Sequence, residues 1–209
     1  MLPSENKECL LEGLQRMFHH MGGVPKTIRF DNLSSAVKKV LSKGERELTD
    51  TFERFVLHYG FQYEFCNPAK GNEKGHVEAM VKYVRNNLLL PEHNLVDVDH
   101  FNETLWVMVE KDKDRIHYNK EILQSELYEE DKNYWLMLPK KEFECVRYTT
   151  AKADKYRIVT LDKKQYSTAP RFSKQQVRIC ITYNEVRILN ENNEMIIKHP
   201  RLYGTKLLS

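Results

Sequence analysis

The chain has 209 residues, of which 41% are hydrophobic and 30% are charged, and its 33 basic and 30 acidic side chains give a formal net charge of +3. This length is enough to bury a core and corresponds to one or two domains. No stretch approaches the roughly 20 consecutive apolar residues of a membrane span, and the sequence does not open on a signal-like segment. We therefore expect a cytoplasmic protein that has no membrane partner.

The positive charge is concentrated near the C-terminus. Residues 1–92 carry 13 basic and 12 acidic side chains, whereas residues 93–138 carry 5 basic and 11 acidic ones. Residues 150–209 carry 12 basic and 5 acidic side chains. A local excess of positive charge attracts polyanions, so the C-terminal part has the composition of a polyanion-binding module.

The first ninety residues alternate between helical and strand-like patterns. Apolar residues at helical spacing predict a helix over residues 8–21, with Ser4 as its N-cap and a glycine pair after its end. A short buried strand is predicted at 27–30 and an alternating strand at 61–66. Two further helices are predicted over residues 45–59 and 74–90. Helices that alternate with short strands indicate an α/β fold.

The rest of the chain contains two segments with different sequence patterns. Residues 93–138 are acidic and helical in pattern, which predicts a helical arm or linker. After Pro139, short strands separated by turns predict a small antiparallel β-barrel or meander. The sequence thus predicts three domains: an α/β part over 1–92, the helical arm over 93–138 and the β-barrel over 139–209.

Two carboxylates lie where hydrophobic patterning would not place them. Asp31 directly follows the strand 27–30, and Glu78 lies on the helix 74–90. Carboxylate oxygens are the ligands that Mg²⁺ prefers, and two such ions about 3.5–4 Å apart can support phosphodiester transfer. The residues alone leave simpler interpretations open, because Glu78 could pair with Lys82 on a solvated face and Asp31 could form an Asx turn or a helix N-cap.

Basic side chains lie on the predicted helix 74–90, which carries Glu78, and on the predicted C-terminal strands. Residues on the helical face of Glu78 could contact phosphates, although His76 could equally cap a turn, and cations on strands are also typical of any wet sheet face. The candidate DNA contacts are Lys74, His76, Lys82, Arg85, Lys155, Arg157, Lys163, Lys164, Arg171, Lys174, Arg178 and Arg187.

Several strings between residues 22 and 86 carry a family resemblance. In chain order they are Gly22–Lys26 (GGVPK), Arg29–Ser34 (RFDNLS), Arg46–Thr49 (RELT), Phe65–Pro68 (FCNP), Gly71–Glu78 (GNEKGHVE) and Val81–Asn86 (VKYVRN). Together they resemble the IstA-type transposases of bacterial insertion sequences, which have a ribonuclease H-like integrase core. The resemblance implies that residues 1–92 are part of such a core.

The resemblance also implies roles for the two acids. Asp31 would be the second acid and Glu78, 47 positions later, the third acid of the D-D-E triad, which holds two Mg²⁺ (or Mn²⁺) ions. Glu73 is a competing third acid. We prefer Glu78 because the pattern places it in the body of the helix and places Glu73 in the preceding turn.

The later strings Tyr156–Asp162 and Gln165–Pro170 resemble the small β-barrel that follows the core in Mu-like and IstA-type transposases. That barrel is taken to contact DNA. The resemblance therefore implies double-stranded DNA, both insertion-sequence ends and target, as the partner. It also implies an ATPase helper protein, and a second copy of the chain, in a homo-oligomer, is a further candidate partner.

The chain departs from the family pattern at its start, because no residue before Pro3 can supply the first catalytic Asp, and the first strands are missing. We therefore expect an N-terminally truncated D-D-E transposase fragment that is inactive alone. One alternative is a non-catalytic protein that binds DNA or caps a transposase. Another is a metal-dependent nuclease with Glu8 or Asp50 as its third acid.

Overall fold

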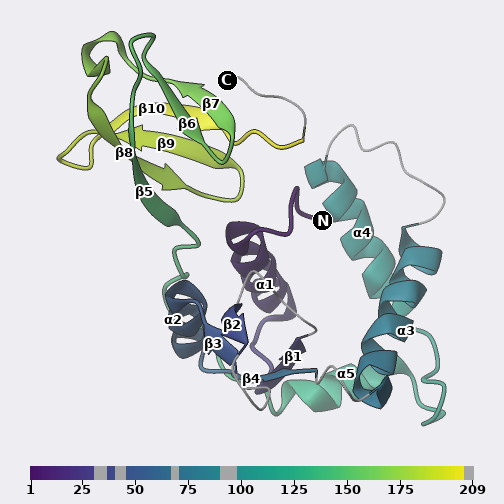
Figure 1. Ribbon diagram of the computed structural model, residues 1–209. Helices are drawn as coiled ribbons and strands as arrows, with labels where there is room; N and C mark the ends of the chain where they lie inside the picture. The colour runs from purple at the N-terminus through teal and green to yellow at the C-terminus, as the bar shows by residue number, and fades with distance from the viewer. Residues whose placement is uncertain (31–36, 41–45, 67–70, 90–97, 205–209) are drawn as a thin grey trace. The chain divides into compact units, whose positions relative to one another are not determined.

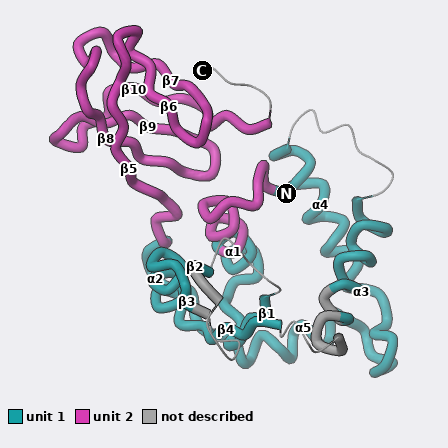
Figure 2. The backbone as a smooth tube through the Cα atoms, in the orientation of Figure 1, with its two compact units in different colours: residues 1, 15–142 teal, residues 2–14, 143–209 magenta. Residues whose placement is uncertain are grey.

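The chain folds as a mixed α/β protein, as the sequence predicts (Figure 1). It consists of two compact units: residues 1 and 15–142 form the first, and residues 2–14 and 143–209 form the second (Figure 2). The computed structural model describes residues 1–30, 37–40, 46–66, 71–89 and 98–204.

Helix α1 spans Lys7–Met21. Its N-cap is Asn6, whose side-chain Oδ1 accepts a hydrogen bond from the backbone N–H of Cys9 at 2.9 Å. This bond satisfies one of the donors that the first helical turn leaves without a partner. The predicted cap, Ser4, is therefore wrong by two residues. Gly22 ends the helix in the left-handed conformation, with φ of 78°.

The capping bond gives a first testable prediction. We expect Asn6→Ala to lower the free energy of unfolding by about 1 kcal/mol, because the Cys9 N–H loses its acceptor. Ser4→Ala is the matched control and should leave stability unchanged. Urea titrations followed by circular dichroism measure both, and equal effects of the two variants would contradict the assignment of the cap.

The first unit contains a parallel β–α–β crossover. Strand β1, Thr27–Phe30, pairs in parallel with β4, Gln62–Phe65, so that Thr27 lies opposite Gln62 and Phe30 opposite Phe65. Parallel neighbours need a crossover connection, and helix α2, Asp50–Tyr59, lies within it. The same connection contains an antiparallel hairpin that the sequence pattern did not predict, made of β2, Val37–Val40, and β3, Arg46–Leu48.

Aromatic side chains from α1 and α2, together with Phe61, the residue before β4, form the core of the first unit. The ring of Phe18 lies 5.0 Å from that of Tyr59 and 5.8 Å from that of Phe61, measured between centroids. Phe52 and Phe55 of α2 are completely buried. The buried Tyr59 hydroxyl donates a hydrogen bond to Gln15 Oε1 at 2.7 Å, so this polar group in the core has a partner. This core holds β1 and β4 against the helices.

Three more helices belong to the first unit. They are α3, Gly71–Leu88, α4, Val98–Asp112, and α5, Gln124–Lys132. The Tyr83 hydroxyl of α3 donates to Asp112 of α4, and the guanidinium of Arg115 lies 4.3 Å from the centre of the Tyr83 ring. Within the described ranges, no helix has both the length and the apolar character that crossing a membrane requires.

The second unit is built on antiparallel strands. The order in its four-stranded sheet is β10, β9, β8, β5, and β6 pairs with β7 in a separate hairpin. The predicted barrel is wrong for the strands that the structure describes: they form no closed ring, because β6 and β7 are short and pair with each other. Their bounds are β5 Arg147–Lys152, β6 Ile158–Leu161, β7 Lys164–Ser167, β8 Gln176–Ile181, β9 Glu185–Leu189 and β10 Met195–Pro200.

One face of the four-stranded sheet and the β6–β7 hairpin enclose the core of the second unit. Val177, Ile179 and Ile181 alternate along β8 toward this core, and Tyr166 of the hairpin is almost completely buried within it. The Tyr166 hydroxyl accepts a hydrogen bond from the backbone N–H of Leu202 at 3.0 Å. The opposite face of the sheet is therefore left toward solvent.

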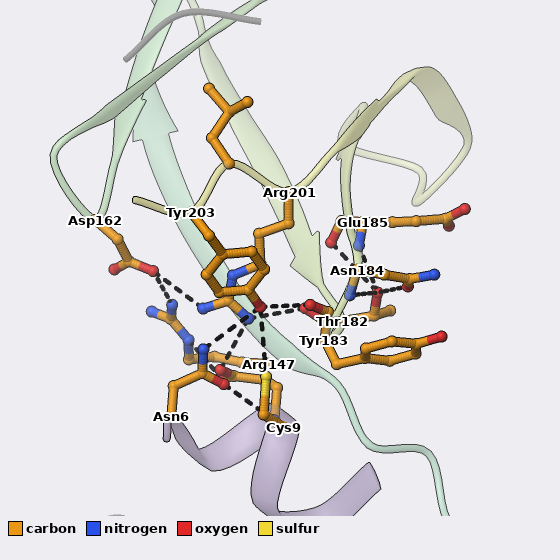
Figure 3. Close-up of polar contacts among 12 residues, drawn as sticks. Asn6, Cys9, Arg147, Asp162, Thr182, Tyr183, Asn184, Glu185, Arg201 and Tyr203 are labelled. Atoms are coloured by element: carbon orange, nitrogen blue, oxygen red, sulfur yellow. Dashed lines mark hydrogen bonds and ion pairs between the residues drawn. The ribbon is translucent and has the colours of Figure 1, made fainter. Parts of the chain in front are cut away.

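An ion-pair network with a buried centre joins the start of α1 to the strands of the second unit (Figure 3). The Glu8 side chain is only 5% exposed; one of its oxygens accepts from Arg147 Nε at 2.9 Å and the other from Arg201 Nη1 at 3.1 Å. Asp162 lies 2.6 Å from Arg147 Nη2 and completes the network. Arg201 also donates to the carbonyl oxygen of Thr182 at 2.8 Å. The charges therefore compensate one another inside the unit.

Candidate nucleic-acid interface

Helix α3 carries three of the predicted site residues on one face. Glu78, Lys82 and Arg85 are all exposed, and their spacing of four and then three residues places them in one stripe along the helix. Lys74 and His76 belong to the same helix, but their side chains lie outside those that the structure describes. The stripe presents both signs of charge to solvent.

The second predicted acid, Asp31, lies outside the described residues, so its placement relative to Glu78 stays a prediction. Among the side chains that the structure does describe, no three His, Cys, Asp or Glu residues are grouped as metal ligands. The described part therefore does not by itself make up a metal centre. Asp31 directly follows β1 in the sequence.

The reason given for preferring Glu78 over Glu73 is wrong. Helix α3 begins at Gly71, so both glutamates are helical, and Glu73 does not lie in a turn before the helix. The polar, glycine-containing residues 71–75 predict a turn, because glycine is unfavourable inside a helix, yet they form the first turn of α3. The choice of Glu78 then depends on the family resemblance alone.

The two alternative third acids are placed differently from each other. Both oxygens of Glu8 are occupied by arginines, which argues against a role as metal ligand. Asp50 is exposed and is the first residue of α2, where a negative charge interacts favourably with the helix dipole. Neither residue therefore strengthens the nuclease interpretation.

The eight cations predicted in the C-terminal part do not form one patch. A loop group lies in two segments joined by hydrogen bonds, since Ala153 N–H donates to the Gln175 carbonyl and Ser173 Oγ to the Lys155 carbonyl. Two further cations lie at the β6–β7 turn, and the last two lie on the four-stranded sheet. The loop group is Lys155, Arg157, Arg171 and Lys174, in the segments before β6 and before β8, where Arg171 belongs to a short 3-10 helix, Pro170–Phe172; Lys163 and Lys164 lie at the β6–β7 turn, and Arg178 and Arg187 on the sheet.

The sheet cations belong to the solvent side of the four-stranded sheet, which we call the outer face. Strand pairing aligns its residues in two rows that cross all four strands in the order β5, β8, β9, β10. One row is Tyr148, Cys180, Arg187 and Lys198, and the other is Thr150, Arg178, Leu189 and Met195. Neighbouring residues in a row are about 5 Å apart, so these side chains form one continuous surface.

Glu185 positions two of the cations on the outer face. Its carboxylate lies 2.9 Å from Arg187 Nη2 and 2.9 Å from Lys198 Nζ. Hydrogen bonds from Lys198 and then from Arg187 lower the pKa of this carboxyl group below its ordinary value. Two cations share one carboxylate, so the cluster keeps a net positive charge.

A hollow of about 480 Å³ opens on the outer face. Tyr148 lines it on β5, while Arg187 and Lys198 line it on β9 and β10. Cys180, whose side chain is short, separates the tyrosine from the two cations along the row. The outer face thus combines an aromatic wall and a cationic wall around one concave site.

Sequence reasoning missed Tyr148, Lys152 and Lys198 because β5 was not predicted and because the charges were counted without knowledge of strand register. The sequence does carry one signal for β5, since the β-branched Thr149 and Thr150 in its middle favour a strand. The side of the sheet on which Tyr148 lies follows only from the structure, in which burial alternates along Arg147–Lys152 and this strand pairs residue by residue with β8.

Comparison with known proteins first identifies the class of the C-terminal part. Residues 138–208 match the family described as "Mu transposase, C-terminal domain". The match includes every strand of the sheet that carries the outer face. The outer face therefore lies within the part of the chain that is similar to this family.

Relatives extend the similarity to nearly the whole chain. A Pseudomonas aeruginosa transposase for insertion sequences IS1326/IS1353 is 26% identical over 208 residues, which cover 96% of this chain and 39% of the relative. The transposase for IS21 from the same organism is 25% identical and covers 94% of this chain and 50% of its own length. A Shigella sonnei IS640 transposase is 32% identical over 57% of this chain and 38% of the relative.

The chain is therefore homologous to the transposases of insertion sequences, which confirms the resemblance predicted from its motifs. It spans half or less of the length of these curated relatives.

Proposed function

We propose that the chain acts in DNA transposition as the part of an insertion-sequence transposase that carries two catalytic acids and a C-terminal DNA-binding module. The observation that carries this proposal is the similarity to transposases over 96% of the chain. Since the chain spans half or less of these relatives, DNA cutting and joining are proposed for the protein that contains the chain in this arrangement.

DNA binding is proposed for the second unit. Arg178, Arg187 and Lys198 lie on one sheet face, and residues 150–209 as a whole carry 12 basic and 5 acidic side chains. Phosphates attract such a surface regardless of base sequence, and the binding then weakens as salt increases. The outer face is therefore the proposed phosphate-binding surface, and the loop cations are not part of it.

Metal binding is proposed for Asp31 and Glu78 within a ribonuclease H-like core over residues 1–92. The parallel pair β1–β4 with α2 in its crossover supports this proposal, because the carboxyl ends of parallel strands meet at one sheet edge and Asp31 follows β1. When bound, two Mg²⁺ or Mn²⁺ ions would supply activation of the attacking oxygen and stabilisation of the leaving oxygen. The two carboxylates of the chain would hold the ions beside the DNA phosphate.

Iron-directed cleavage tests the metal proposal without requiring catalysis. Fe²⁺ replaces Mg²⁺ at carboxylate sites, and with ascorbate and peroxide it cuts the nearby backbone. We expect cuts near residues 31 and 78 that excess Mg²⁺ suppresses. Asp31→Asn should abolish the cut near 78, and Glu78→Gln the cut near 31, because both acids would hold the same ions.

Glu53→Gln, which removes an exposed carboxylate of α2, is the matched control and should leave the cuts in place. Cuts that persist at one acid after the other is neutralised would refute a shared site. Cuts at neither position would refute metal binding there.

A second candidate function is a non-catalytic protein that binds DNA or caps a transposase. The observation in its favour is that the outer face is built from the chain's own cations and needs no ion. The two functions differ in metal dependence: salt-dependent DNA retention that is unchanged by Mg²⁺ and by Asp31→Asn would favour the second.

A further inference from the structure

Tyr148 is an exposed aromatic residue on a cationic sheet. Its side chain is 62% exposed although its neighbours in the row, Cys180 and Arg187, are buried or half-buried. The pKa of its phenol is raised, first by electrostatic repulsion from the Cys180 sulfur and then by partial desolvation.

The surroundings of Tyr148 suit a planar, negatively charged ligand. Cys180 forms the floor beside the ring, and the short side chain leaves the hollow open toward Arg187 and Lys198. Glu185 accepts from both cations and so fixes their positions. Met195, also exposed, adds an apolar group at the rim. A ring, a hollow and two fixed cations are thus combined in one place.

We propose that this hollow binds a nucleotide of an unpaired DNA strand, with the base stacked on Tyr148 and the adjoining phosphate held by Arg187 and Lys198. Aromatic stacking platforms combined with cationic grooves are how proteins bind single strands without reading their sequence. Bases inside a duplex are already stacked on one another, so a face-on aromatic contact requires an unpaired base. The proposal rests on the DNA-binding function proposed above and adds the strand state of the DNA.

Fluorescence anisotropy with the full chain tests the proposal. The probes are a labelled 20-mer of thymidine and a labelled 20-base-pair duplex of mixed sequence. We expect Tyr148→Ala to bind the single strand about tenfold more weakly, because stacking on one base is lost. Tyr148→Phe, which keeps the ring, should stay within about twofold of wild type, and binding of the duplex should change by less than about twofold in both variants.

Tyr156→Ala is the matched control, because Tyr156 is equally exposed in the same unit, lies beside Lys155 and is not on the outer face. It should bind both probes as wild type does. Circular dichroism checks that each variant is folded, and Tyr148 is exposed enough to be replaced.

Three outcomes would overturn the proposal. In the first, Tyr148→Ala binds the single strand as tightly as wild type does. In the second, its affinity for the single strand and its affinity for the duplex fall by the same factor. In the third, Tyr148→Ala and Tyr156→Ala bind the single strand equally weakly. Failure of the proposed function looks different, because wild type would then bind neither probe. A 5-iodouracil strand that crosslinks to the peptide containing Tyr148 would support the proposal directly, and crosslinks confined to other peptides would contradict it.

Discussion

Replacing Glu8 by alanine is expected to lower the free energy of unfolding of the second unit by about 3–5 kcal/mol. Glu8 is the carboxylate that neutralises Arg201, whose side chain is only 7% exposed, and it also pairs with Arg147. Without Glu8, the buried guanidinium keeps Asp162 at 3.5 Å as an ionic partner, the Thr182 carbonyl as a hydrogen-bond acceptor and the Tyr203 ring, 5.3 Å away, as a cation–π contact. A buried charge that loses its main counterion is far costlier than a lost surface ion pair.

Urea unfolding followed by circular dichroism, together with amide hydrogen exchange in β8 and β9, measures this effect. Exchange localises the loss to the second unit, which contains neither tryptophan of the chain. Glu191→Ala is the matched control: this glutamate is exposed in the turn between β9 and β10, and its removal should change stability by less than about 0.5 kcal/mol.

A double variant separates charge burial from packing. In Glu8→Leu with Arg201→Met, no buried charge of this pair remains, so much of the lost stability should return. If instead the double variant loses as much free energy of unfolding as the two single variants lose together, Glu8 and Arg201 stabilise the unit through independent contacts. A Glu8→Ala variant with wild-type stability would contradict the network.

Local pattern predicted the regular elements where one face of the element is buried. Helix α1 and strands β1 and β4 follow directly from apolar residues at periods of about 3.6 and 2, because their apolar sides face the aromatic core of the first unit. The family motifs, too, are local strings, and the comparisons confirm what they imply about homology. Such information is contained within a few neighbouring residues.

The features that were missed depend on partners distant in sequence. Glu8 was considered as a metal ligand, but its role is set by Arg147 and Arg201, more than a hundred positions away. On sequence alone the cations of the C-terminal part form one group, because the sequence does not contain the register that aligns Arg187 with Lys198. The barrel was predicted from strand count, whereas closure depends on which strands pair.

Strand register places Arg178, Arg187 and Lys198 together on the outer face, so replacing them should have a large effect on DNA binding. We expect the combined change Arg178→Ala, Arg187→Ala and Lys198→Ala to weaken binding of a 20-base-pair duplex about a hundredfold at 0.1 M salt. Each cation that pairs with a phosphate releases roughly one counterion, so the slope of log K against log salt should fall by about 3. Anisotropy titrations at four salt concentrations measure both quantities.

The loop cations provide a control with the same change in charge. The combined change Lys155→Ala, Arg171→Ala and Lys174→Ala should weaken binding by less than about tenfold, because cations outside the contact surface act through a field that salt screens within about 10 Å. Glu185→Gln should act in the opposite direction and tighten binding severalfold, since it removes a negative charge that Arg187 and Lys198 now share. If the loop variant loses as much affinity as the outer-face variant, or if Glu185→Gln weakens binding without unfolding, the phosphates lie elsewhere than on the outer face.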